Sequence, residues 1–220
     1  RSSDLYIYTR FWIECKVLFD SLNLFITMEK EKIIIANAQP HQASDIASLI
    51  MLAMNHDCCR YFAGPNHTLN DFHQLMTRLV QRNDSQYSFL HTLVALDDNQ
   101  VIGCCVSYEG GRLKALRQAF IDEALNSFGI DYSGMNDETQ AGELYVDSLA
   151  VDARYQGKGI ATALLNATCK KAEALGLPVG LLVDKGNPDA ERLYHRLGFH
   201  YVDDGEWGSH PMKHLQKKIQ

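Results

Sequence analysis

One stretch of the chain has the composition of a phosphate-binding turn, the sequence QGKGIA at residues 156–161. It follows an apolar run typical of a strand and precedes the periodicity of an amphipathic helix. Two common patterns do not fit, because G-x-G-x-x-G/A fails at Thr162 and G-x-x-x-x-G-K-S/T fails where Gly159 follows Lys158. The first N–H groups of a helix still lack intrahelical partners, so they can bind a diphosphate that glycines allow to approach. The alternative is that the glycines only permit a tight turn.

Composition limits the kind of protein and its partners. The 220 residues fit one large domain or a domain with an appendage, and 46% hydrophobic residues are enough for a core. The net charge of −6 argues against nucleic acid as a partner and would suit a cationic substrate. No apolar run is long enough for a membrane helix, so no membrane partner is expected.

The six cysteines include no CxxC motif. Their spacing favours buried thiols in a reducing compartment, and a cytoplasmic location is expected. The stretch HDCC, residues 56–59, offers the residue types that bind metals but not their usual spacing, so no metal site is expected.

The first 27 residues differ from the rest of the chain. They mix aromatic and charged residues, whereas the sequence from Met28 onward has the character of an ordinary protein start. We expect residues 1–27 to be an N-terminal extension, native or not, and residues 28–220 to form a single domain.

Hydrophobic periodicity and caps predict an alternation of strands and helices. The first helix follows Pro40, the second is expected over residues 69–81 with Asn70 as its cap, and another is capped by Asn187 and ended by Gly198. Two further helices are predicted over residues 112–128 and 159–175. The predicted strands cover residues 32–38, 88–96, 100–108, 143–151, 179–185 and two stretches of the tail. This order predicts a mixed sheet with helices on both faces.

Two blocks of the chain resemble the acyl-CoA N-acyltransferases of the GNAT superfamily. The sequence LAVDARYQGKGIATALL, residues 149–165, resembles the family's motif Q/R-x-x-G-x-G/A between a strand and a helix. The sequence NPDAERLYHRLGF, residues 187–199, resembles its second block, and the resemblance extends over about residues 32–218. It implies an α/β (α+β) fold of three layers, α/β/α, whose mixed, largely antiparallel sheet is splayed between the strands 143–151 and 179–185.

The same resemblance implies the residues that bind acetyl-CoA, the acyl donor. The strand segment Leu149, Ala150 and Val151 would pair with the pantetheine arm through its backbone. Asn187 would lie near the thioester, and Tyr194 would protonate the departing thiolate. The diphosphate would be wrapped by Gln156, Gly157, Lys158, Gly159, Ile160 and Ala161.

Two carboxylates remain alternatives for the base that takes a proton from the acceptor amine. Side chains two residues apart share one face of a strand, so Glu143 and Asp147 point the same way. Glu143 stands where some family members have a base, and Asp147 lies closer to the thioester. Each could instead have an ordinary structural role.

The segment 109–142 is longer than the family's minimal connection and is expected to shape the acceptor pocket. Tyr108, Glu109, Tyr132 and Met135 are candidates to line it. No acceptor can be carried over from the family onto this insertion.

The leading hypothesis is an enzyme that transfers an acetyl group from acetyl-CoA to a primary amine of a small molecule or protein. The amine would attack directly in a ternary complex, without a metal, and a homodimer is possible. One alternative is a non-catalytic sensor or interaction module that binds acyl-CoA. A weaker alternative is an acyltransferase that uses a longer acyl chain.

Overall fold

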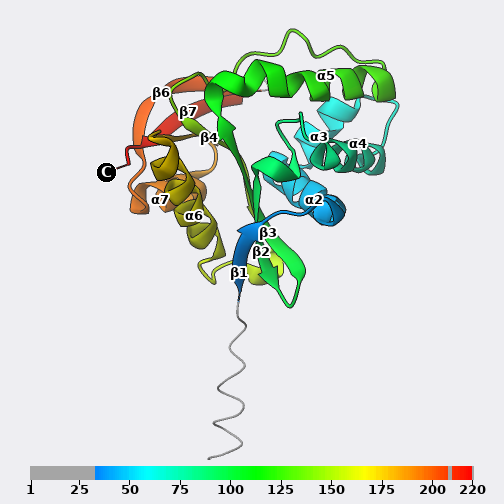
Figure 1. Cartoon of the computed structure of the whole chain (residues 1–220). Helices are drawn as coiled ribbons and strands as arrows, with labels where there is room; N and C mark the ends of the chain where they lie inside the picture. Colours follow the sequence, from blue (N-terminus) through cyan, green and yellow to red (C-terminus); the bar gives the residue numbers. More distant parts are fainter. Residues whose placement is uncertain (1–32, 208–209, 220) are drawn as a thin grey trace, which may run out of the picture. The chain divides into compact units, whose positions relative to one another are not determined.

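A single seven-stranded sheet organises the chain in the computed structural model, which describes residues 33–207 and 210–219. The strand order is β1-β2-β3-β4-β5-β7-β6, and only β4 and β5 are parallel (Figure 1). This confirms the predicted mixed, largely antiparallel sheet. The expected extension, residues 1–27, lies outside the described residues. The strands are β1 (Ile34–Asn37), β2 (Thr92–Asp97), β3 (Gln100–Glu109), β4 (Leu144–Val151), β5 (Val179–Asp184), β6 (His200–Trp207) and β7 (His210–Lys217).

Helices cover both faces of the sheet, as predicted, and give three layers (Figure 1). One face carries α2 (Ala43–Met54), α3 (His56–Ala63), α4 (Leu69–Gln81) and α5 (Leu113–Phe128). The other carries α6 (Ile160–Leu175) and α7 (Pro188–Arg196). Apolar side chains of α2 to α5 form one large core with those of β2 and β3. The sheet is therefore buried on both faces near its centre, which fixes the strands that carry the site.

The two parallel strands separate part of the way along their length. Pairing between β4 and β5 covers only Leu144 to Val146 and Val179 to Leu181. Beyond that point β4 still pairs with β3, and β5 still pairs with β7. The second half of β4 therefore has no neighbouring strand on its β5 side, and an extended ligand could add to that edge. The expected splay is present where the sequence placed it.

Two local expectations differ from the structure. The N-cap of α4 is Thr68, not Asn70, and its hydroxyl accepts a hydrogen bond of 3.2 Å from the Asp71 N–H. The Asp71 carboxylate in turn accepts a hydrogen bond of 2.8 Å from the Thr68 N–H, so Thr68 and Asp71 form a capping box. Asn70 already lies within the first helical turn and therefore cannot be the cap. The short helix α3 was not predicted, because only a brief apolar stripe, Cys59, Phe62 and Ala63, marks it.

The apolar side chains of the insertion pack into the core. Phe120 of α5 packs edge-on against Phe62 of α3 at a ring-centroid distance of 5.4 Å. Tyr132 follows α5 and donates its hydroxyl to the backbone oxygens of Tyr61 and Phe62 at 3.0 and 3.2 Å. The insertion thus packs against α3, while Leu113 and Leu116 at the start of α5 form a cluster with Tyr145 of β4, against which Leu182 of β5 packs.

Candidate active site

The glycine-rich turn connects the end of β4 to the start of α6. Gly157 and Gly159 have φ of +76° and +82°. This left-handed conformation is unfavourable for any residue other than glycine. Gly159 is the N-cap of α6, whose first internal hydrogen bond runs from the Ala163 N–H to the Gly159 carbonyl at 3.0 Å. The three N–H groups before Ala163 have no partner within the helix. A Cβ at either glycine would meet no heavy atom within 4 Å, so the space beside both glycines is open.

Side chains of the turn brace it. Gln156 donates from Nε2 to the Val151 carbonyl at 3.1 Å, which links the turn to the end of β4. The Lys158 ammonium lies 4.9 Å from the centroid of the Tyr155 ring, within range of a cation–π contact. The backbone of the turn is thus held in place, and its small residues leave room for an anion at the positive end of α6.

A cavity of about 250 Å³ lies where β4 and β5 separate. The structure brings Asp147, Leu149, Asn187 and Tyr194 together in its wall, whereas Glu143 is not part of the lining. Other elements contribute the remaining wall, among them Asn55, Cys58, Tyr87, Glu138, Tyr145, Asp184, Trp207, His210 and Met212. The cavity therefore combines three carboxyl groups with four aromatic rings, a lining that suits an organic cation.

The insertion contributes Glu138 to this wall, and not the residues expected from it. Tyr108, Glu109, Tyr132 and Met135 do not line the cavity. Tyr132 and Met135 belong to the hydrophobic core, and the Glu109 carboxylate accepts a hydrogen bond from the Gly111 N–H at the start of the insertion. No sequence signal marks Glu138, because it lies in a polar loop without periodicity.

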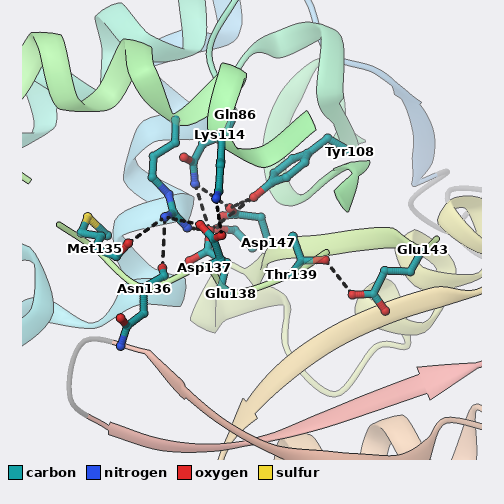
Figure 2. Close-up of polar contacts among 12 residues, drawn as sticks. Gln86, Tyr108, Lys114, Met135, Asn136, Asp137, Glu138, Thr139, Glu143 and Asp147 are labelled. Carbon is teal, nitrogen blue, oxygen red and sulfur yellow. Dashed lines mark hydrogen bonds and ion pairs between the residues drawn. The ribbon is translucent and has the colours of Figure 1, made fainter. Parts of the chain in front are cut away.

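Glu138 and Asp147 share hydrogen-bond donors at the back of the cavity (Figure 2). The Tyr108 hydroxyl lies 3.0 Å from Asp147 Oδ2 and 3.3 Å from Glu138 Oε1. The Gln86 amide nitrogen lies at the same two distances from the same two oxygens. Ser148 donates a further hydrogen bond of 2.9 Å to Asp147 Oδ1. The two carboxyl groups therefore form one buried unit.

Burial and mutual repulsion change the proton affinity of this unit. Burial, and then the neighbouring Asp147 charge, raise the pKa of Glu138 to about 7. Burial likewise raises the pKa of Asp147, although hydrogen bonds from Ser148, Gln86 and Tyr108 oppose the rise. Like charges held close in a dry site resist joint ionisation. A carboxyl group with such a pKa can exchange protons near neutral pH.

One buried guanidinium faces this pair. The side chains of Arg117 and Glu138 are each 5% exposed, and Arg117 Nη2 lies 3.4 Å from Glu138 Oε1. Arg117 Nη1 donates to the Asn136 carbonyl at 3.0 Å and approaches Asp137 Oδ1 at 3.4 Å. Arg117 thus ties α5 to the loop that carries Glu138.

By strand alternation Glu143 shares a face with Asp147, but other groups bind its carboxylate. Thr139 and Gln216 donate to its carboxylate at 2.7 and 3.1 Å, and His214 Nε2 lies 2.9 Å from Oε2. Burial raises the pKa of Glu143, but these hydrogen bonds outweigh it and leave the pKa below its usual value. The hydrogen bond to Glu143 also raises the pKa of His214, which contacts Asp203 through its other nitrogen. Glu143 therefore joins β4 to β7 through a buried ion pair.

Tyr194 and Asn187 lie on the opposite side of the gap, on and before α7. Asn187 is the N-cap of α7 and accepts a hydrogen bond of 3.1 Å from the Ala190 N–H, and Pro188 occupies the first helical position. This cap fixes the start of the helix that carries Tyr194. Burial raises the pKa of Tyr194 to about 12, so its hydroxyl keeps its proton at neutral pH.

The part of the chain that the structure describes holds neither a metal-binding cluster nor a membrane-spanning helix. Among the described residues, no three His, Cys, Asp or Glu side chains gather in a way that could hold a metal. Within residues 33–207 and 210–219, no helix is both long and apolar enough to cross a bilayer.

The splayed sheet, the cavity at the splay and the glycine turn after β4 define an acyltransferase type of site. The model of the acetyltransferase (GNAT) family matches residues 53–199, and the chain belongs to this family. This confirms the resemblance stated from the two sequence blocks.

Individual relatives support the same family. A crystal structure of an N-acetyltransferase from Staphylococcus aureus Mu50 has a TM-score of 0.72 and 25% identity, covering 83% of this chain and 99% of that one. A mycothiol acetyltransferase from Nocardiopsis dassonvillei is 43% identical over 70 residues, which is 31% of this chain and 21% of that protein. Acetyltransferase Atu2258 from Agrobacterium fabrum is 41% identical over 66 residues, which is 30% of this chain and 47% of that protein. The matches to these two curated relatives thus span less than half of their lengths.

Proposed function

We propose that the protein is an N-acetyltransferase that moves an acetyl group from acetyl-CoA to a primary amine of a small molecule or protein. The observation that carries this proposal is that Asp147 on β4 and Tyr194 on α7 line one cavity at the point where β4 and β5 separate. A base and an acid in one cavity suit a reaction that removes a proton from the nucleophile and returns one to the leaving group.

The acyl donor fits the residues around the gap. The open positive end of α6, framed by Gly157 and Gly159, would bind the diphosphate through backbone N–H groups. The unpaired edge of β4 over Leu149 to Val151 would hold the pantetheine arm as an added strand. Gln156 would support this site indirectly, since its amide already binds the Val151 carbonyl. When bound, acetyl-CoA supplies the activated acetyl group.

The acceptor amine must lose a proton before it can attack, because alkylammonium groups have a pKa near 10.4. We assign the base to Asp147 in preference to Glu143, because Asp147 lines the cavity and Glu143 does not. Tyr194 would donate its proton toward the departing sulfur, for which its raised pKa keeps it protonated. Direct attack then needs no covalent enzyme intermediate.

The test is a panel of primary amines with acetyl-CoA and a thiol-reactive dye. The panel should contain monoamines, diamines, amino acids and short peptides. We expect release of CoA with at least one amine and a matching mass increase of about 42 Da in that amine. Binding of acetyl-CoA by calorimetry without any release would instead support the sensor alternative.

A further inference from the structure

We propose that Glu138 is a second proton-transfer residue of this site, and that Glu138 and Asp147 act as one base whose extra negative charge is balanced by the ammonium group of the acceptor. This inference rests on the proposed function and names a residue that the sequence motifs do not contain.

First, the buried charges around Glu138 and Asp147 do not cancel. Arg117 supplies one buried positive charge, which it shares between Glu138 and the half-exposed Asp137. Glu138 is at least nine-tenths buried, and Asp147 lines the same cavity, so this one charge cannot balance both carboxylates of the pair. A buried charge without a partner is costly, so the second carboxylate needs either a proton or another cation. Glu138 and Asp147 both line the cavity, so a ligand bound there would lie beside this pair. An acceptor ammonium carries the positive charge that the pair lacks.

Second, Glu138 and Asp147 share hydrogen-bond donors. Tyr108 and Gln86 each reach one oxygen of Glu138 and one of Asp147, so the two carboxyl groups share donors and a proton added to one changes both. The buried Arg117 Nη2 points at Glu138 from 3.4 Å, yet it has no hydrogen-bond partner among the described residues. The buried Gln86 Oε1 is also without one in that part of the chain. The unit is therefore incompletely satisfied without a ligand.

The proton step balances as follows. The pair begins with both carboxylates ionised, and the acceptor enters as R–NH₃⁺. One proton passes from nitrogen to the pair, which leaves a neutral amine beside one protonated and one ionised carboxyl group. The amine nitrogen then bonds to the acetyl carbon while the carbon–sulfur bond breaks. The second nitrogen proton replaces the one that Tyr194 gives to the sulfur, and the pair later releases its proton to water.

Other charged and titratable groups surround the pair and must be considered in any pH profile. Tyr108 approaches from β3, Arg117 from α5, Tyr145 from β4 and Tyr87 from the segment before β2. The cavity wall adds Cys58 from α3, Asp184 from β5, Tyr194 from α7 and His210 from β7. None of these is a second carboxylate in hydrogen-bonded contact with the same donors, so Glu138 is the residue to change.

The experiment compares pH profiles of kcat/KM for the wild type and for Glu138→Gln, using the best amine from the panel. In the wild type the acidic limb should lie near pH 7, where Glu138 and Asp147 lose their shared proton. Removing one charge should lower the pKa of the remaining carboxyl group, so E138Q should move this limb at least one unit toward acid. Its kcat should fall roughly 10- to 100-fold because a weaker base remains.

A double variant tests whether Glu138 and Asp147 act as one base or in two independent roles. Asp147→Asn should reduce kcat about 100-fold or more, and E138Q/D147N should be no worse than D147N alone within a factor of about three. Multiplied losses, or an acidic limb that stays in place in E138Q, would overturn the proposal. Asp122→Asn is the matched control, because it removes one exposed negative charge from the same insertion and should leave the limb where it is.

A measurement on the unchanged protein covers the case in which a variant does not fold. Carboxyl ¹³C NMR of the full chain should show one Glu resonance that titrates near pH 7 and a coupled Asp resonance. Completion of every carboxyl titration below pH 5 would refute the pair. This titration needs no substrate, so its failure is distinct from the failure of the amine panel.

Discussion

The two glycines at the ends of α6 allow the diphosphate site to be tested apart from backbone strain. Gly159 at the N-cap has φ of +82°, and Gly176 at the C-cap has φ of +66°. A Cβ at either position would meet no heavy atom within 4 Å. Alanine should therefore impose the same kind of strain at both ends, but only at Gly159 would its methyl group occupy the proposed diphosphate site.

The expected magnitudes follow from these geometries. A left-handed conformation costs an alanine about 1–2 kcal/mol, so Gly159→Ala and Gly176→Ala should each lower Tm by roughly 2–8 °C. The methyl group at residue 159 should also separate the diphosphate from at least one N–H group. Loss of one hydrogen bond to a charged group is worth about 1.5–3 kcal/mol, which predicts a 10- to 150-fold rise in the Kd for acetyl-CoA.

Isothermal titration calorimetry of acetyl-CoA into both variants and the wild type gives the answer, with thermal melts as the measure of strain. G176A should bind acetyl-CoA within twofold of the wild type. If G159A also binds within twofold, the turn does not hold the diphosphate. If both variants lose affinity equally, the loss comes from the helix as a whole and the reasoning fails as well.

Two further predictions concern Tyr194 and Glu143. Tyr194→Phe should lower kcat about 10- to 100-fold while the Kd for acetyl-CoA stays within twofold, and an unchanged kcat in a stopped-assay comparison would remove its hydroxyl from the mechanism. Glu143→Gln should cost about 1–3 kcal/mol of stability at pH 6. Because the pKa of Glu143 is lowered by folding, Glu143 stabilises the fold at pH values above about 4.3, its pKa in the unfolded chain. Because the pKa of His214 is raised by folding, His214 contributes its full stabilisation only below about pH 6.5, its pKa in the unfolded chain. The Tm difference between wild type and E143Q should therefore be largest between about pH 5 and 6.5, and a difference that is constant from pH 3 to 9 would contradict the ion pair.

The fold was largely predictable because its signals are local. Gly129 and Gly176 end α5 and α6 in left-handed conformations, as their places after the apolar stripes predict. Asn187 and Pro188 begin α7 for similar reasons. Where the signal was weaker, as at Thr68 and in α3, the prediction was displaced or absent, because several polar residues compete for one cap and a short helix has little periodicity.

The candidate site was only partly predictable. The glycine turn and Tyr194 lie in contiguous motifs, and the roles proposed for them still await the tests above. The choice between Glu143 and Asp147 could not be made from the strand, since alternation places both on the same face. The tertiary structure separates them, because Asp147 lines the cavity, whereas Glu143 is held by His214 and Gln216, which are more than 70 residues further along the chain.

The sequence by itself determined the family, the order of the strands and longer helices, and the turn at the start of α6, because each depends on neighbouring residues. Only the tertiary structure placed Glu138 beside Asp147, under donors from Gln86 and Tyr108 and across from Arg117. These five side chains come from separate segments, and nothing in the local pattern of any one of them specifies the others. Packing of α5 against the rest of the core brings them together, and burial then gives the two carboxyl groups a proton affinity that neither would have in water.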